Sequence, residues 1–252
     1  MAEPATRIGT NRTGIQASPF DMQKLEEIAS KAPARPAEEL RASMMRQDFM
    51  KHTDGFGSVP APGSVRGMAT TAMEAIKGHK PATFIDKLGE RLAFERSGVR
   101  AYEAVLVKFD ALGTWEGGPS HDLLLHQHDE ELEHFNMLTD VIERLGADPT
   151  TMTPSADVTS VAGSGIFKVL SDPRTTLPQA LQGLLMLEDA DLEGWTTLIG
   201  LADSIGQDKL ADQFRAAHET EETHQTRVRE WLAKAVLADA HRELDGQGTA
   251  TG

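Results

Sequence analysis

Two short segments of this sequence place a carboxylate beside an imidazole: Glu131 with His134, and Glu221 with His224. In each pair the histidine follows the glutamate by three positions, so on a helix both side chains project from the same face. Carboxylate oxygens and imidazole nitrogens are ligands that iron, manganese and zinc accept in proteins. Two such pairs on separate helices, joined by an acidic residue from each of two further helices, would build a dinuclear metal site.

The composition limits the other functions that the chain could have. Its 252 residues include 39 acids and 25 bases, which give a net charge of -14. This charge disfavours nucleic-acid binding and suits an acidic protein that attracts cations. There are no cysteines, which excludes disulfides, a thiol nucleophile and a cysteine-ligated iron–sulfur cluster. The N-terminus lacks the apolar core of a secretion signal, and no apolar run approaches about 18 residues, so we expect a cytoplasmic protein without a membrane segment.

The distribution of proline and glycine predicts three regions. Residues 1–78 contain half of the twelve prolines and only short apolar patches, which predicts an irregular N-terminal arm with short helices. Residues 79–244 carry long stripes of apolar residues at helical spacing and predict one helical bundle. The glycine-rich residues 245–252 predict a flexible tail.

Within the bundle, the apolar stripes predict four long helices. Ser120 is placed to cap the second helix, and Pro178 falls in the first turn of the third. A long connection over residues 147–176, with a short partly apolar segment at 161–170, is typical of a crossover that spans a bundle from end to end. The expected fold is therefore an all-α four-helix bundle with a long crossover between its second and third helices. The helices are expected to begin near residues 81, 120, 177 and 208.

Each of the four apolar stripes is interrupted near its middle by a glutamate. Glutamate is almost never fully buried unless it is paired or bound to a metal. Four carboxylates at one level of a bundle would repel one another, whereas two divalent cations would neutralise them and His134 and His224 would complete the ligand set. If the helices have a different rotational phase, these glutamates are instead solvated. The four glutamates are Glu95, Glu131, Glu188 and Glu221.

Taken together, these residues resemble the ligand pattern of the ferritin-like superfamily, which has a glutamate, a Glu-x-x-His pair, a glutamate and a second Glu-x-x-His pair. The local pattern is similar to rubrerythrin-like and bacterioferritin-like members, which carry an aromatic residue seven positions after the first ligand, as Tyr102 follows Glu95 here. The resemblance implies a di-iron or di-manganese site with Tyr102 beside it as a catalytic residue. It further implies that Glu131 and Glu221 bridge or chelate, that Glu95 and Glu188 bind terminally or bridge, and that His134 and His224 each bind one metal.

The sequence departs from these relatives in three places. Rubrerythrins carry a rubredoxin module with four cysteines, so an electron donor for this chain must be external. They also have a second glutamate on the third helix, where this chain has the shorter Asp191. Di-iron hydroxylases often place aspartate before each Glu-x-x-His glutamate to orient the histidines; Glu130 and Thr220 stand there in this chain.

The expected function is that of an oxidoreductase with two iron ions, or alternatively manganese, of the peroxidase, ferroxidase or catalase type. Its partners would be peroxide or dioxygen and an external electron donor, with no nucleic acid and no membrane. A homo-oligomer such as a dimer is expected. Two other functions stay open: iron storage of the ferritin class, and a metal-free bundle with a structural role. Met186, close to Glu188, is expected to fill a gap in the core rather than to bind metal.

Overall fold

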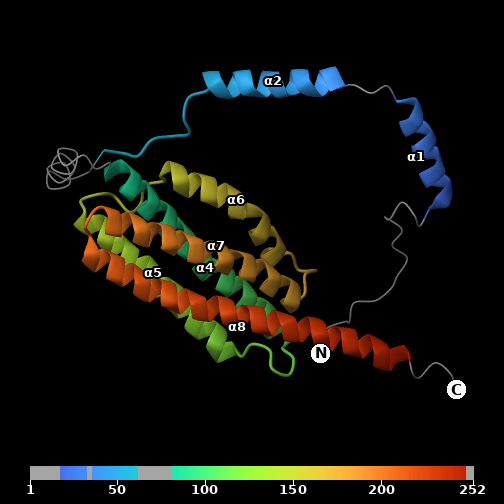
Figure 1. Cartoon of the computed structure of the whole chain (residues 1–252). Coiled ribbons are helices and arrows are strands. Elements are labelled where there is room, and N and C mark those ends of the chain that lie inside the picture. The colour runs from blue at the N-terminus through green and yellow to red at the C-terminus, as the bar shows by residue number, and fades with distance from the viewer. Residues whose placement is uncertain (1–17, 33–35, 62–80, 248–252) are drawn as a thin grey trace. The chain divides into compact units, whose positions relative to one another are not determined.

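The computed structural model describes residues 18–32, 36–61 and 81–247. Within these ranges the chain forms seven helices and no strand (Figure 1), so the predicted all-α class is confirmed. Contacts divide the chain into two compact units, one containing Thr6–Phe56 and the other containing Gly57–Gly252. The predicted boundary between arm and bundle, at residues 78 and 79, lies outside the described residues.

The described part of the smaller unit contains two helices, α1 (Pro19–Lys31) and α2 (Pro36–His52). No residue of α1 is buried. Most large apolar side chains of the two helices are exposed, including Phe20 and Ile28 on α1 and Met44 and Phe49 on α2.

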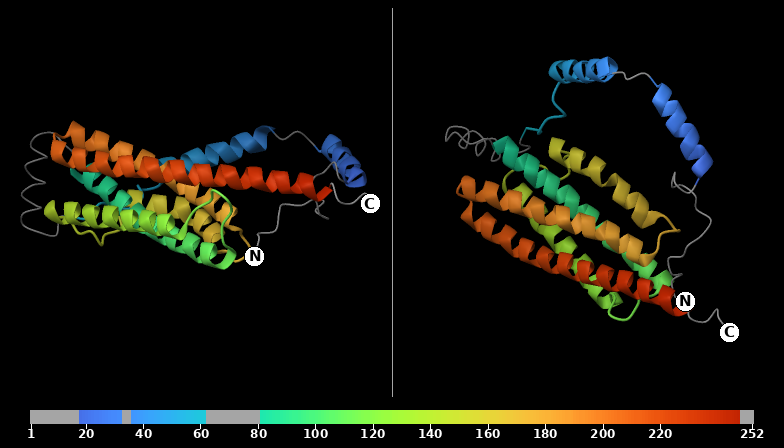
Figure 2. Two further views of the ribbon diagram at one scale, coloured as in Figure 1. Left: turned by 90° about the horizontal axis from the view of Figure 1, so that it is seen from below. Right: turned by 45° about the vertical axis from the view of Figure 1, so that its right-hand side comes forward.

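Over residues 81–247, the larger unit is a bundle of four long helices with a fifth helix along its side. The four are α4 (Pro81–Leu112), α5 (His121–Arg144), α7 (Leu177–Ser204) and α8 (Asp208–Gln247). The most extensive contacts join α7 to α8 and α4 to α5, and Figure 2 shows the four helices side by side. Helix α8 includes Asp245 to Gln247, so the segment expected as a flexible tail begins within a helix.

Local sequence signals fix several helix ends. The Ser120 hydroxyl accepts a hydrogen bond from the Leu123 amide at 3.2 Å, as expected of a cap on α5. Thr176 and Gln179 form a reciprocal capping box at the start of α7, followed by proline in the first turn. Gly146, which follows α5, has φ of 82°, a left-handed conformation that glycine adopts without a steric penalty.

The crossover helix α6 (Pro154–Ser171) is longer than the predicted segment at 161–170, because capping signals precede the apolar stretch. Thr153 caps the helix and Pro154 occupies its first turn. Hydrogen bonds tie this end of α6 to α4: the Ser155 amide and hydroxyl both donate to the Asp86 carboxylate, at 2.9 and 2.7 Å. Helix α6 packs against α4 and α7, so it covers one side of the bundle.

The core of the bundle consists of two apolar clusters, and each contains residues from all four long helices. The first includes Leu88, Leu138, Trp195 and Phe214. The second includes Tyr102, Leu124, Leu181 and Trp231. The predicted glutamates fall between the two clusters in the sequence of every helix. No helix in the described part of the chain is long and apolar enough to cross a membrane.

Candidate metal centre

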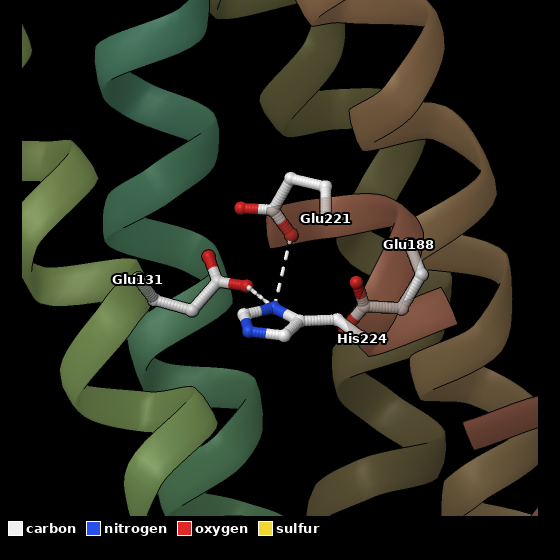
Figure 3. A group of neighbouring side chains, drawn as sticks. All are labelled: Glu131, Glu188, Glu221 and His224. Atoms are coloured by element: carbon white, nitrogen blue, oxygen red, sulfur yellow. Dashed lines mark ion pairs between the residues drawn. The ribbon is translucent and has the colours of Figure 1, made fainter. Parts of the chain in front are cut away.

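A layer of buried carboxylates crosses the bundle between the two apolar clusters. Glu95 and Glu221 are 0% exposed, and Glu131 and Glu188 are 2% exposed. They come from α4, α8, α5 and α7 respectively, so every long helix contributes one. Figure 3 shows three of these carboxylates turned toward the His224 ring. The alternative of solvated glutamates is therefore excluded for these four side chains.

The six residues predicted as ligands lie in overlapping groups. In one of them, Glu131, Glu188, Glu221 and His224 each offer a ligand atom within 4.8 Å of the others. A second group combines Glu95, His134 and Glu221 at the same spacing. Glu221 belongs to both groups, so its carboxylate lies between two potential cation positions.

Both histidines direct Nδ1 into the carboxylate layer. His134 Nδ1 lies 2.6 Å from Glu221 Oε1, and His224 Nδ1 lies 3.0 Å from Glu221 Oε2. His224 Nε2 lies 2.8 Å from Glu130 Oε2. A proton on Nε2, donated to Glu130, leaves the Nδ1 lone pair free for a cation. Glu130 of α5 thus reaches across to α8 and holds the His224 ring.

The second histidine has different surroundings. The His134 and Trp195 rings pack in a T-shaped arrangement, with ring centroids 5.6 Å apart. Thr220, which precedes Glu221, donates to the Ala216 carbonyl of its own helix rather than to a histidine. The two histidines therefore make similar contacts with the carboxylate layer through Nδ1, but the groups on the other side of each ring differ.

Tyr102 contacts the layer directly. Its hydroxyl donates to Glu188 Oε1 at 2.6 Å, and its ring meets the His224 ring edge-on. Burial and the neighbouring Glu188 raise the pKa of Tyr102 well above its ordinary value, so the phenol keeps its proton and remains a donor. The other oxygen of Glu188, Oε2, is buried without a hydrogen-bond partner.

Arg91 and Asp191 also belong to the layer, and the sequence interpretation did not include them as site residues. Asp191 groups with Glu95, Glu131 and Glu221 within 4.8 Å. Arg91 is only 3% exposed. Its Nε lies 2.9 Å from Glu95 Oε1, and its guanidinium also forms an ion pair with Asp191. A signal was present, because Arg91 stands four residues before Glu95 and Asp191 three after Glu188, each on the same helix face.

Two glycines make room for this layer. A methyl group on Gly98 of α4 would overlap the carboxylate of Glu131, and one on Gly194 of α7 would overlap the guanidinium of Arg91. Glycine inside a helix costs stability relative to alanine. At these two positions it allows a charged side chain of the layer to lie against a neighbouring helix.

The charges of the layer call for compensation. When ionised, five carboxylates and one guanidinium leave four negative charges, which two divalent cations would neutralise. Seven buried atoms of the layer are carboxylate oxygens or imidazole nitrogens that suit iron or manganese, so the donor set fits such ions. These atoms, which have no hydrogen-bond partner outside the layer, are both oxygens of Glu95 and of Glu221, Oε2 of Glu188, and Nδ1 of His134 and His224.

Protons provide the other means of compensation, as the shifted pKa values show. Burial, reinforced by Glu221, raises the pKa of Glu188 to about 8. Burial lowers the pKa of His134, but hydrogen bonds to Glu221 and Glu95 outweigh it and raise that pKa to about 10. Hydrogen bonds to Glu131 and Glu221 likewise outweigh burial and raise the pKa of His224 to about 12. Without cations, the layer therefore holds protons at neutral pH.

This combination of fold and site defines a class: a helical bundle with a crossover helix and a buried layer of carboxylates and histidines. The family model for the ferritin-like domain matches residues 85–238, a range that contains every residue of the layer. The chain belongs to this family, which confirms the resemblance inferred from the motifs. Comparison with curated proteins and with solved structures gave no match.

Proposed function

We propose that the buried layer binds two metal ions, iron or manganese, and that the protein is an oxidoreductase that acts on peroxide or dioxygen. One observation carries the proposal: buried carboxylate oxygens from four helices and two imidazole rings converge in overlapping groups, and within each group the ligand atoms lie within 4.8 Å of one another. A structural role alone would not require an ionisable layer of this kind inside an apolar core.

The two overlapping groups divide the ligands between two positions. His224, Glu188 and Glu131 would hold one ion, His134 and Glu95 the other, and Glu221 would be shared between them. Two bound iron ions would supply one electron each. Together these are the two electrons that reduce one peroxide to water. A third and fourth electron for continued turnover must come from an external donor, because the chain has no cysteine to carry a redox cluster.

The remaining residues position the ligands and exclude water. Tyr102 fixes Glu188 by its hydrogen bond to Oε1, and Glu130 fixes the His224 ring through Nε2. The apolar clusters on both sides of the layer keep bulk water away, which strengthens electrostatic interactions within it. Arg91 contributes a fixed positive charge beside Glu95 and Asp191.

The test is a peroxide titration of protein loaded anaerobically with Fe(II), with excess metal removed. We expect about two iron ions per chain and oxidation of about two irons per peroxide. Oxidation should stop at that point unless a reductant is added. Protein that binds neither metal after anaerobic loading with Fe(II) and, separately, with Mn(II) would refute the proposal.

The same titration separates turnover from storage. A ferritin-type storage protein would continue to oxidise added Fe(II), and a mineral would grow to tens of irons per chain. We favour turnover with an external reductant. Sustained iron uptake would replace that choice while leaving the proposed ligands unchanged.

A further inference from the structure

A cleft lies on the side of the bundle where α6 packs against α4 and α7. Its volume is about 360 Å³, a size typical of sites for small organic molecules. Apolar side chains form most of its walls, among them Phe94 of α4, Val158 and Ile166 of α6, and Leu187 of α7. Met186 also lines the cleft and is 57% exposed, so the expectation that it fills a gap in the core was wrong; it lies about 200° around the helix from Glu188.

Arg91 separates this cleft from the carboxylate layer. Arg91 lines the cleft together with Gly194. Because Gly194 has no side chain, Nη1 of Arg91 can occupy the space next to it. On its other side the guanidinium contacts Glu95 and Asp191. A molecule in the cleft would therefore be one side chain away from the proposed metal ligands.

The guanidinium of Arg91 has donors to spare. It carries five N–H groups, and three of them meet Glu95, the Asp191 carboxylate and the Asp191 carbonyl oxygen. Among the described residues no further acceptor is found for the other two. A buried N–H without an acceptor is costly, and a carboxylate is the best match to a guanidinium fork.

The other charges at the cleft are compensated or exposed. Lys87 Nζ lies 2.6 Å from Glu90 Oε2, and the Thr159 hydroxyl donates to Glu90 Oε1 at 2.8 Å. Glu193 is an exposed lining residue, and its negative charge disfavours a second acid group on a bound molecule. Arg91 is also paired, with Glu95 and Asp191, but it keeps two N–H groups without an acceptor in the described part of the chain. It is therefore the cationic donor at the cleft for an acidic ligand, and Phe94 lies against its face at 4.3 Å.

We propose that the cleft binds a small monocarboxylic acid with an apolar body. The carboxylate would accept hydrogen bonds from Arg91, and the apolar part would lie between α4, α6 and α7. Binding to the cleft is independent of the metal centre. The idea that such an acid is an organic co-substrate of the centre rests on the proposed function.

The test uses octanoate as the probe and 1-octanol as its uncharged counterpart. Binding to the full-length protein is followed by tryptophan fluorescence, since the Trp195 ring lies 5.5 Å from Arg91 Cζ, and by calorimetry. We expect one saturable site per chain for octanoate and binding of 1-octanol that is weaker by roughly tenfold or more. Equal affinities for the two would overturn the role of Arg91.

Two matched variants locate the site. Ala190 lines the cleft and is exposed, so Ala190→Phe should fill the cleft and abolish octanoate binding. Ala216 is exposed on α8, which contributes no residue to the cleft, so Ala216→Phe should bind octanoate like the unmodified protein. If Ala190→Phe binds octanoate normally, the proposed site is wrong. Metal content is measured in parallel and should be equal in both variants; a protein without metal would refute the centre and not the cleft.

Discussion

The two histidines of the layer occupy unequal surroundings although the same short motif supplies both. The Nε2 atom of His224 is held by Glu130, whereas the His134 ring packs against Trp195 in a T-shaped arrangement. A hydrogen bond from a ligand imidazole to a carboxylate fixes the ring and increases its basicity. We therefore expect the position that contains His224 to hold its ion more firmly than the position that contains His134.

Replacing either histidine tests their assignment as ligands. His134→Ala and His224→Ala should each lower the metal content from about two ions toward one per chain, as measured by elemental analysis after anaerobic loading. His121→Ala is the control, because His121 is half-exposed at the start of α5. An unchanged metal content in both ligand variants would exclude these histidines from the centre.

The protons of the metal-free layer predict how metal binding depends on pH. The pKa values of Glu188, His134 and His224 are raised to about 8, 10 and 12, so all three groups hold protons at neutral pH. A cation must displace these protons, and binding should therefore release protons and weaken as the pH falls. The effect is largest below about pH 8 and decreases above it, where Glu188 has already lost its proton.

Calorimetric titration with Mn(II) in two buffers of different ionisation enthalpy measures the number of protons released. We expect at least one proton per metal ion at neutral pH. Affinity that does not change between about pH 6 and 8 would mean that the layer is not protonated in the metal-free protein.

The residues that sequence reasoning found and missed differ in kind. The six proposed ligands were identified because carboxylates and imidazoles interrupt apolar stripes. Arg91 was missed because arginine does not bind metals, although it stands in the same stripe as Glu95. Gly98 and Gly194 could not be recognised at all, because their role depends on which side chain of a neighbouring helix lies against them.

At the scale of the helices, two glycines provide a matched pair of substitutions. Gly98→Ala in α4 would push the Glu131 carboxylate out of its place, so metal content should fall while the helix persists. Gly200 in α7 has open space around it, so Gly200→Ala should stabilise the protein by about 0.5–1 kcal/mol. Metal content and thermal unfolding are measured for both variants. Equal metal content in the two would contradict the proposal that Gly98 makes room for the Glu131 carboxylate.

The crossover helix shows where sequence prediction of elements succeeds and where it stops. Its approximate position followed from the length of the connection, and its true start could be read from Thr153 and Pro154. Its attachment to α4 through Asp86 could not, because those hydrogen bonds join residues 69 positions apart. The cleft beside α6 depends on that attachment, so no local pattern predicts it.

For the whole molecule, metal binding should raise the melting temperature. Free metal at 100 times its dissociation constant adds about 2.7 kcal/mol to the free energy of unfolding, which is about 5–10 °C for a bundle of this size. The difference between metal-free and loaded protein should shrink in Glu188→Gln, which keeps the shape of the side chain and removes its charge. Differential scanning calorimetry measures both, and identical melting temperatures would mean that no ion binds the layer.

The two apolar clusters, one on each side of the layer, have a consequence for how the protein matures. Each cluster by itself joins all four long helices, so the helices can pack at both ends of the bundle before any ion binds. The chain should then fold without metal, and the proposed ions should bind to the folded protein. Which metal it finally carries would be decided by the supply in its surroundings at that later moment, and the same folded protein could be an iron protein in one growth condition and a manganese protein in another.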